Sequence, residues 1–128
     1  MIHYVNSLNG IAAGQLRGVF EGWPKPPSPQ THLRLLSSSD EIVLAIDDSS
    51  RDVVGFITAI TDGVLAAYIP LLEVVPAYRG RVIGRELVLR MLKRLERFYM
   101  VDLLCDSSLE SFYSELGMTP STGMMIRR

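Results

Sequence analysis

The sequence predicts a mixed α/β fold, in which one sheet holds antiparallel and parallel strands and carries helices on both faces. An Asp62-Gly63 pair separates two runs rich in Val, Ile, Ala and Thr, which is typical of a tight β-hairpin. An amphipathic helical pattern follows the hairpin, and an apolar run follows the helix. Such a strand–helix–strand unit predicts a right-handed crossover to a parallel strand. The length of 128 residues predicts one domain, residues 1–128.

Composition and charge narrow the class of protein. Hydrophobic residues make up 48% of the chain, which is enough for a buried core, and the net charge is −1. The charge gives no general reason to expect nucleic acid or an anionic membrane as a partner. A single cysteine, Cys105, excludes an internal disulfide. Without an apolar run of about 18 residues or a signal-peptide pattern, we expect a cytoplasmic protein that does not bind membranes.

The N-terminal third is predicted to contain a strand, two helices and a proline-rich connection. Residues 2–7 alternate apolar and polar side chains, as a strand does. Residues 8–23 space their apolar side chains in a helical period, although two glycines weaken that prediction. Four prolines within 24–30 oppose regular structure there, and 31–39 predicts a short helix that ends in serines.

The rest of the chain alternates strands and helices. Its apolar runs and turn residues predict strands at 41–47, 53–61 and 64–75, then a long helix with a stripe of Ile83, Leu87, Met91, Leu95 and Phe98, a strand at 100–105, a short helix at 108–116 and a last strand at 123–127.

Pro70 interrupts the predicted strand 64–75. Proline cannot donate to a strand ladder, so the pairing must relax there. Two interpretations stay open: a bulge at a bend of the strand, or separation of this strand from its parallel neighbour, which would leave backbone groups free in a cleft. Ligands of open α/β sheets bind beyond the carboxyl ends of the strands, and the loop 76–84 lies at such an end.

The stretch VVPAYRGRVIGREL, residues 74–87, leads from the end of a strand to the start of a helix. The first amides of a helix lack partners within it and lie at its positive end, so the stretch predicts an anion site. Residues 79–97 carry seven Lys or Arg side chains against two Glu. Those at the helix start add to its field, whereas those farther along are expected to form a solvated face.

Two motifs resemble those of the GNAT superfamily, the Gcn5-related N-acetyltransferases. The family signature is Arg or Gln, two residues, Gly, one residue, then Gly or Ala. FYSELGM, residues 112–118, resembles the family turn Tyr-Glu-x-x-Gly-Phe, with Met118 in place of the aromatic residue. The two motifs stand in the family order, and the element order resembles the family along nearly the whole chain. The signature aligns with Arg79-Gly80-Arg81-Val82-Ile83-Gly84, where Val82 replaces the middle glycine.

The resemblance implies an acetyl-CoA-dependent N-acetyltransferase, with acetyl-CoA as co-substrate between two parting parallel strands. The pantetheine arm would bond to the backbone of one strand, and the pyrophosphate would lie on the amides at the helix start. Asp106 stands where many relatives carry an asparagine that contacts the pantetheine. The residues so implied in cofactor binding are Leu72, Glu73, Val74, Arg79, Gly80, Arg81, Val82, Ile83, Gly84 and Asp106.

Catalytic and acceptor-binding residues follow from the same resemblance. In this family an amine attacks the thioester directly, so the amine must lose a proton and the leaving thiolate must gain one. Tyr113 aligns with the thiolate acid, and Glu73 is our candidate base, directly or through a water. The side of its strand that Glu73 faces stays open. Phe20 and Trp23 lie in the segment that roofs the acceptor pocket, where they either stack on the acceptor or pin a loop in the core.

The acceptor implied by the resemblance is a small-molecule amine or a protein amino group, and a homodimer is common in the family. A non-catalytic GNAT-like module that binds acyl-CoA or another partner is the alternative. His3 and His32 are isolated in the sequence, so neither a metal site nor a nucleophilic pair with Cys105 is expected.

Val82 decides how well the predicted anion site works. A β-branched residue at positive φ is an outlier, so we expect Val82 in the first helical turn with a negative φ. Its side chain would then lean toward the ligand end of the helix. We therefore expect a cofactor site that persists but is weakened.

Overall fold

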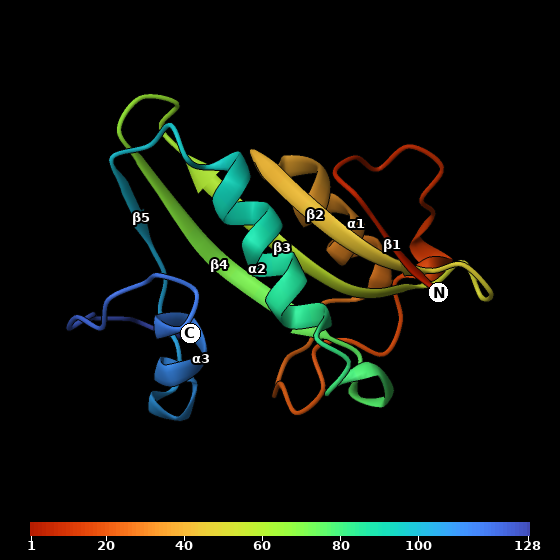
Figure 1. The fold of residues 1–128 in the computed structure, drawn as a ribbon. Helices are drawn as coiled ribbons and strands as arrows, with labels where there is room; N and C mark the ends of the chain where they lie inside the picture. The colour runs from red at the N-terminus through yellow and green to blue at the C-terminus, as the bar shows by residue number, and fades with distance from the viewer.

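The computed structural model describes all 128 residues and contains one mixed sheet of five strands in chain order. The first four strands pair antiparallel, and the fifth pairs parallel to the fourth (Figure 1). The predicted fold class is therefore confirmed. The strands are β1 (Ile2–Val5), β2 (Glu41–Asp47), β3 (Val53–Thr61), β4 (Ala66–Val74) and β5 (Met100–Asp102).

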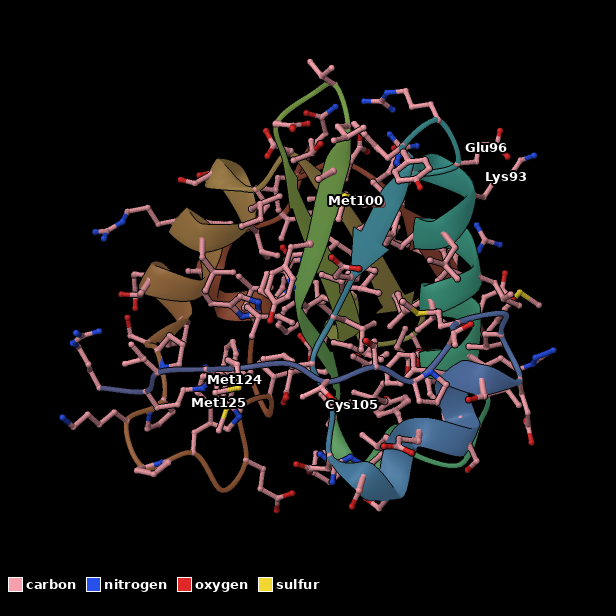
Figure 2. The ribbon with its side chains drawn as sticks, turned by 90° about the vertical axis from the view of Figure 1, so that its left-hand side faces the viewer. Lys93, Glu96, Met100, Cys105, Met124 and Met125 are labelled. Carbon is pink, nitrogen blue, oxygen red and sulfur yellow. The ribbon has the colours of Figure 1, made fainter.

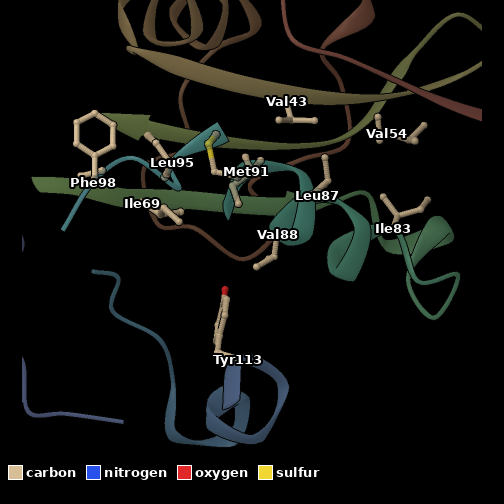
Figure 3. Packing of buried hydrophobic residues seen from close by; sticks show 14 residues of the cluster. Val43, Val54, Ile69, Ile83, Leu87, Val88, Met91, Leu95, Phe98 and Tyr113 are labelled. Carbon is tan, nitrogen blue, oxygen red and sulfur yellow. The ribbon is translucent and has the colours of Figure 1, made fainter. Parts of the chain in front are cut away.

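Helices cover both faces of the sheet, because each face presents apolar side chains that need a partner. Helix α1 (Pro29–Ser38) packs on one face through His32 and Leu36. Helix α2 (Ile83–Arg94) packs on the other, where Leu87 and Met91 face the sheet (Figure 3). A third helix, α3 (Glu110–Ser114), follows β5 on the α2 side. None of these helices combines the length and apolarity that a bilayer span requires.

The prediction of a helix over residues 8–23 is wrong. Only one 3₁₀ turn forms there, η1 (Ala13–Gln15). Gly10, Gly18 and Gly22 all take positive φ, between 76° and 81°, which an α-helix does not allow. The backbone conformation of the glycines therefore prevents an α-helix here, despite the helical spacing of the apolar residues.

Helix α1 begins two residues earlier than predicted. The Ser28 hydroxyl accepts a hydrogen bond from the Thr31 amide at 3.1 Å, which caps the helix. Pro29 occupies the first helical position, where a missing N–H costs nothing. The last proline of the proline-rich connection is thus part of the helix, whereas residues 24–28 are irregular as expected.

The predicted strand at 123–127 is absent, and β5 ends at Asp102 rather than at residue 105. The C-terminal segment crosses the strands instead of running along β5, with Met124 and Met125 on the far side of Cys105 from α3 (Figure 2). A Cβ on Gly123 would lie 2.2 Å from Leu104 Cδ2, so the segment is packed directly against the residues that follow β5. A strand needs a neighbour in register, and a crossing segment has none.

Both interpretations of Pro70 hold in the structure. Thr58 pairs with Leu71 and Ile60 with Tyr68, so β4 has one residue more than β3 over this stretch, which is a bulge. On its other side, β4 pairs with β5 only through residues 66–68. Residues 69–74 of β4 therefore have no strand neighbour on the β5 side.

His32 is an unusual member of the core. Its side chain is 1% exposed, and neither ring nitrogen has a hydrogen-bond partner. The rings of Phe20 and Phe56 lie 5.0 and 4.4 Å from the imidazole, centroid to centroid. Burial in this apolar setting lowers the pKa of His32 to about 4.

This burial predicts a specific loss of stability in acid. Because the pKa of His32 is lower in the folded than in the unfolded chain, its contribution is present above pH 6.5 and is lost as the pH falls toward 4. From pH 7 to pH 4, wild type should lose about 3 kcal/mol more of unfolding free energy than His32→Phe. Urea unfolding at both pH values measures this. Parallel losses in the two proteins would show that His32 does not titrate as a buried group.

Candidate active site

The start of α2 offers unpaired backbone donors. The first amide of this region that bonds within the helix is that of Glu86, to the Val82 carbonyl at 3.1 Å. The amides of residues 83–85 have no protein partner, and the Val82 side chain cannot cap them. Such a helix start attracts phosphate. The start of α2 is thus an uncapped helix end, which is the feature on which the anion-site prediction rests.

Two arginines lie in the loop that leads to this helix start. The Arg79 guanidinium lies 3.6 Å from Glu21, and its Nε donates to the Val74 carbonyl at 3.2 Å. The Arg81 guanidinium lies over the Tyr78 ring, 4.9 Å from its centroid. These contacts orient two guanidinium groups of the loop before α2. The Arg79 charge is paired with Glu21, whereas Arg81 has no ion-pair partner and adds to the local positive potential.

The prediction of a negative φ for Val82 is wrong. Val82 precedes the helix rather than joining its first turn, and its φ is 58°, in the left-handed region. Gly80, two residues earlier, also has a positive φ of 80°. The loop therefore imposes the conformation that a glycine would take without strain, and the sequence supplies a β-branched residue there. The Val82 side chain is 72% exposed, so burial does not offset that strain.

Residues 72–74 of β4 send their side chains to opposite faces. Leu72 and Val74 pack against the apolar cluster between α2 and the sheet, called the α2 cluster below. The Val75 amide bonds to the Val54 carbonyl on β3 at 2.8 Å. Since backbone groups alternate along a strand, Leu72 and Val74 direct theirs to the opposite side, where β5 has already diverged. This is an open strand edge.

Glu73 faces the α1 side of the sheet, which settles the side left open by the sequence. Its Oε1 accepts a hydrogen bond from the Phe20 amide at 3.0 Å. Phe20 is only 3% exposed and packs in the core, so its ring is not available at the surface. Trp23 lies against Phe20 with 42% of its side chain exposed. Phe20 thus joins Glu73 and Trp23 in one cluster on this side of the sheet.

Tyr113 lies on the α2 side of the sheet. It is 8% exposed, and in Figure 3 its hydroxyl points toward Val88 of α2. Burial raises the pKa of Tyr113 to about 12. No group of the chain hydrogen-bonds to its hydroxyl, although that oxygen is not among the fully buried polar atoms. The hydroxyl is therefore free to donate to a ligand.

The neighbouring residues of the second motif bring α3 to the start of α2. A Cβ on Gly84 would lie 3.9 Å from both the Phe112 ring and a Val74 methyl, so these three residues meet at ordinary contact distance. Asp106 and Cys105 are exposed, and the Asp106 side chain makes no capping bond. The structure thus brings the helix start and the β4 edge together with Phe112, the residue before Tyr113, while Asp106 is exposed.

One residue of this region was missed by sequence reasoning. His32 lies beside Phe20 with two unpartnered nitrogens, yet a single histidine in an amphipathic helix gives no signal of such a contact. Its position depends on the packing of α1 against β3 and on the path of residues 16–23.

Comparison with known proteins agrees with this architecture. Residues 8–118 match the acetyltransferase (GNAT) family. A provisionally assigned acetyltransferase from Deinococcus radiodurans R1 is 44% identical, with a TM-score of 0.95 over 99% of this chain and 88% of that chain. A GNAT family acetyltransferase from Streptococcus pneumoniae TIGR4 is 25% identical, with a TM-score of 0.73 over 100% and 98% of the two chains. Glucosamine-6-phosphate N-acetyltransferase from Arabidopsis thaliana shares the fold, at 15% identity and a TM-score of 0.71 over 100% and 98%. No curated protein matches the sequence.

The chain therefore belongs to the GNAT family, and it is an N-acetyltransferase. The family match spans both motifs, from the N-terminal segment to Met118.

The left-handed conformation of Val82 generates a stability prediction. Glycine at this position removes the clash of a β-branched side chain at positive φ, and the exposed side chain contributes little burial. Val82→Gly should raise the free energy of unfolding by about 1 kcal/mol, net of the greater entropy of glycine in the unfolded chain. Denaturant unfolding measures this, with Val82→Ala as the control that keeps a Cβ and should gain less. A destabilised glycine variant would contradict the strain.

Proposed function

We propose that this N-acetyltransferase uses acetyl-CoA and transfers the acetyl group to an amine by direct attack, without an acyl-enzyme. The observation that carries the proposal is the open β4 edge beside the uncapped start of α2. An extended arm with amide groups suits the edge, and a pyrophosphate suits the helix start. The amides of residues 83–85 lack protein partners, and among the edge groups of Leu72 and Val74 the Val74 carbonyl accepts a hydrogen bond from Arg79 Nε, so the residues fit this co-substrate with one edge group already engaged.

The chain divides the binding task between two elements. The backbone of Leu72 and Val74 would hold the pantetheine arm, and the amides of residues 83–85 would hold the pyrophosphate together with Arg79 and Arg81. When bound, acetyl-CoA supplies the activated acetyl group as a thioester. The acceptor would approach from the other side of β4, where Glu73 and Trp23 lie.

Acid and base lie on opposite faces of β4. Glu73 takes the proton that the amine loses as its nitrogen bonds to the acetyl carbon, directly or through a water. Tyr113 gives its proton to the thiolate sulfur as the carbon–sulfur bond breaks. The raised pKa keeps Tyr113 protonated throughout the neutral range, so it is always ready to donate. A small-molecule amine or a protein amino group would serve as acceptor in this scheme.

The overall proposal is tested by release of free thiol from acetyl-CoA in the presence of a panel of primary amines. Amine-dependent thiol release with matching acetylated product supports it. Tight acetyl-CoA binding with no transfer to any amine would instead identify a binding module of this fold.

Tyr113→Phe tests the acid. The substitution removes only the hydroxyl, so kcat should fall roughly 10- to 10⁴-fold, while the acetyl-CoA Kd stays within about twofold. Steady-state kinetics and calorimetry give the two values. Tyr99→Phe is the matched control, because Tyr99 is 86% exposed and lies away from the site. Near-wild-type turnover of Tyr113→Phe would remove Tyr113 from the mechanism.

Val82→Gly tests whether the exposed valine crowds the pyrophosphate. Removing the side chain at the mouth of the helix start should tighten acetyl-CoA binding about tenfold, which is about 1.4 kcal/mol. Calorimetric Kd values for wild type, Val82→Ala and Val82→Gly form a series in which affinity should rise as the side chain shrinks. Equal affinities across the series would refute crowding.

A further inference from the structure

Phe20 is held in a strained conformation at the acceptor side of the sheet. Its φ is 62°, a left-handed value that disfavours any residue with a Cβ. Gly18 and Gly22 on either side also have positive φ, 79° and 81°. Such strain costs of order 1–3 kcal/mol and persists only where surrounding contacts hold it. The contacts of Phe20 show what holds it.

The two ends of Phe20 are bound by different groups. Its backbone N–H donates to Glu73 Oε1 at 3.0 Å. Its ring sits in an aromatic cage, edge-on to three rings at centroid distances of 5.0 Å (Trp23), 5.0 Å (His32) and 5.7 Å (Phe56). The cage thus accepts an aryl ring, and the carboxylate accepts an N–H two carbon atoms away from that ring.

Nitrogen, Cα, Cβ and phenyl of Phe20 have the same connectivity as a 2-arylethylamine. Glu73, the candidate base, already holds the nitrogen of this unit. An acceptor bound in the same way would place its amine on Glu73 and its ring in the cage.

We propose that Phe20 occupies the acceptor site of this enzyme and that the acceptor is a 2-arylethylamine, which displaces Phe20 when it binds. This inference rests on the proposed acetyl transfer only for the fate of the amine, not for its binding. In the reaction, the amine nitrogen bonds to the acetyl carbon, the carbon–sulfur bond breaks, and Glu73 takes the proton that the nitrogen loses.

His32 indicates what the aryl ring carries. Its two nitrogens lie in the cage, 99% shielded from solvent, without a partner. Phe20 has no polar atom on its ring to satisfy them, so the chain leaves a donor and an acceptor unused at this point. A hydroxyl on the acceptor ring would pair with the imidazole. His32 is therefore assigned as a specificity-determining residue for a hydroxylated ring.

Binding is tested first, without acetyl-CoA. Trp23 is the only tryptophan and lies edge-on to Phe20, so its fluorescence reports displacement of that ring. Phenethylamine should give a saturable change at a concentration at least about tenfold lower than benzylamine, 3-phenylpropylamine or 2-cyclohexylethylamine. These three amines alter the spacer or the aromaticity alone. Equal responses to all four amines, or none to phenethylamine, would overturn the inference.

Selectivity is tested next with variants. Tyramine should bind about tenfold more tightly than phenethylamine in wild type, and His32→Phe should abolish that difference. Thr58→Val is the matched control: Thr58 is fully buried on the same face, its hydroxyl also lacks a partner, and it lies two residues from Phe56 along β3. An unchanged tyramine preference in His32→Phe, or an equal loss in Thr58→Val, would refute the role of His32.

Measuring acetylation beside binding tests this inference and the proposed function separately. Saturable phenethylamine binding with no acetylated product would reject acetyl transfer to this class and leave the binding site standing. Acetylation of aliphatic amines with no preference for phenethylamine or tyramine would support the transferase and overturn the inference. In wild type we expect both binding and acetylation, with the acceptor KM raised about tenfold or more in Glu73→Gln.

Discussion

The parting of β4 from β5 is the constraint on which the rest of the site depends. Parallel strands normally pair along their length, and each unpaired backbone group has a cost unless another partner satisfies it. Here the extra residue near Pro70 bends β4, and its pairing with β5 ends at Tyr68. The open edge then lies beside the start of α2, which is itself uncapped. The unpartnered amides of α2 thus lie close to the β4 edge, since a Cβ on Gly84 would be 3.9 Å from a Val74 methyl.

The sheet also separates two different surroundings. On the α2 side, the cluster that includes Leu72, Val74 and Tyr113 forms a dense wall along the open edge. On the α1 side, Glu73 reaches a loop whose backbone is bent by glycines and whose one phenylalanine is strained. A rigid side suits a co-substrate that does not vary. A segment with strained contacts suits an acceptor, because its displacement returns part of the strain energy.

Local signals in the sequence were enough for most strands of the sheet and for the start of α2. The strands at 41–47 and 53–61 were predicted with their observed bounds, because alternation and turn residues are short-range properties. The helix predicted over residues 8–23 is absent because three glycines there take positive φ, despite the helical spacing of the apolar residues. The strand predicted at 123–127 is absent because a strand needs a neighbour to pair with, and that depends on the tertiary fold. The predicted negative φ of Val82 is wrong for a different reason, because the geometry of the loop sets this angle and the conformational preference of valine does not. The contact of Glu73 with Phe20 joins residues 53 positions apart, which no local pattern reveals.

Two residues with a Cβ, Val82 and Phe20, are strained in this region of the fold. Val82 and Phe20 both take left-handed conformations without being glycine, and each lies next to backbone or side-chain groups that a ligand would use. At Val82 the side chain points into solvent and nothing in the protein offsets the strain, so the cost falls on the loop before α2. At Phe20 the cage and the Glu73 carboxylate offset it. The first strain is therefore uncompensated and local, whereas the second is compensated by contacts within the core. The proposed acceptor site rests on this difference, because only the contacts of Phe20 are ones that a ring and an amine could replace.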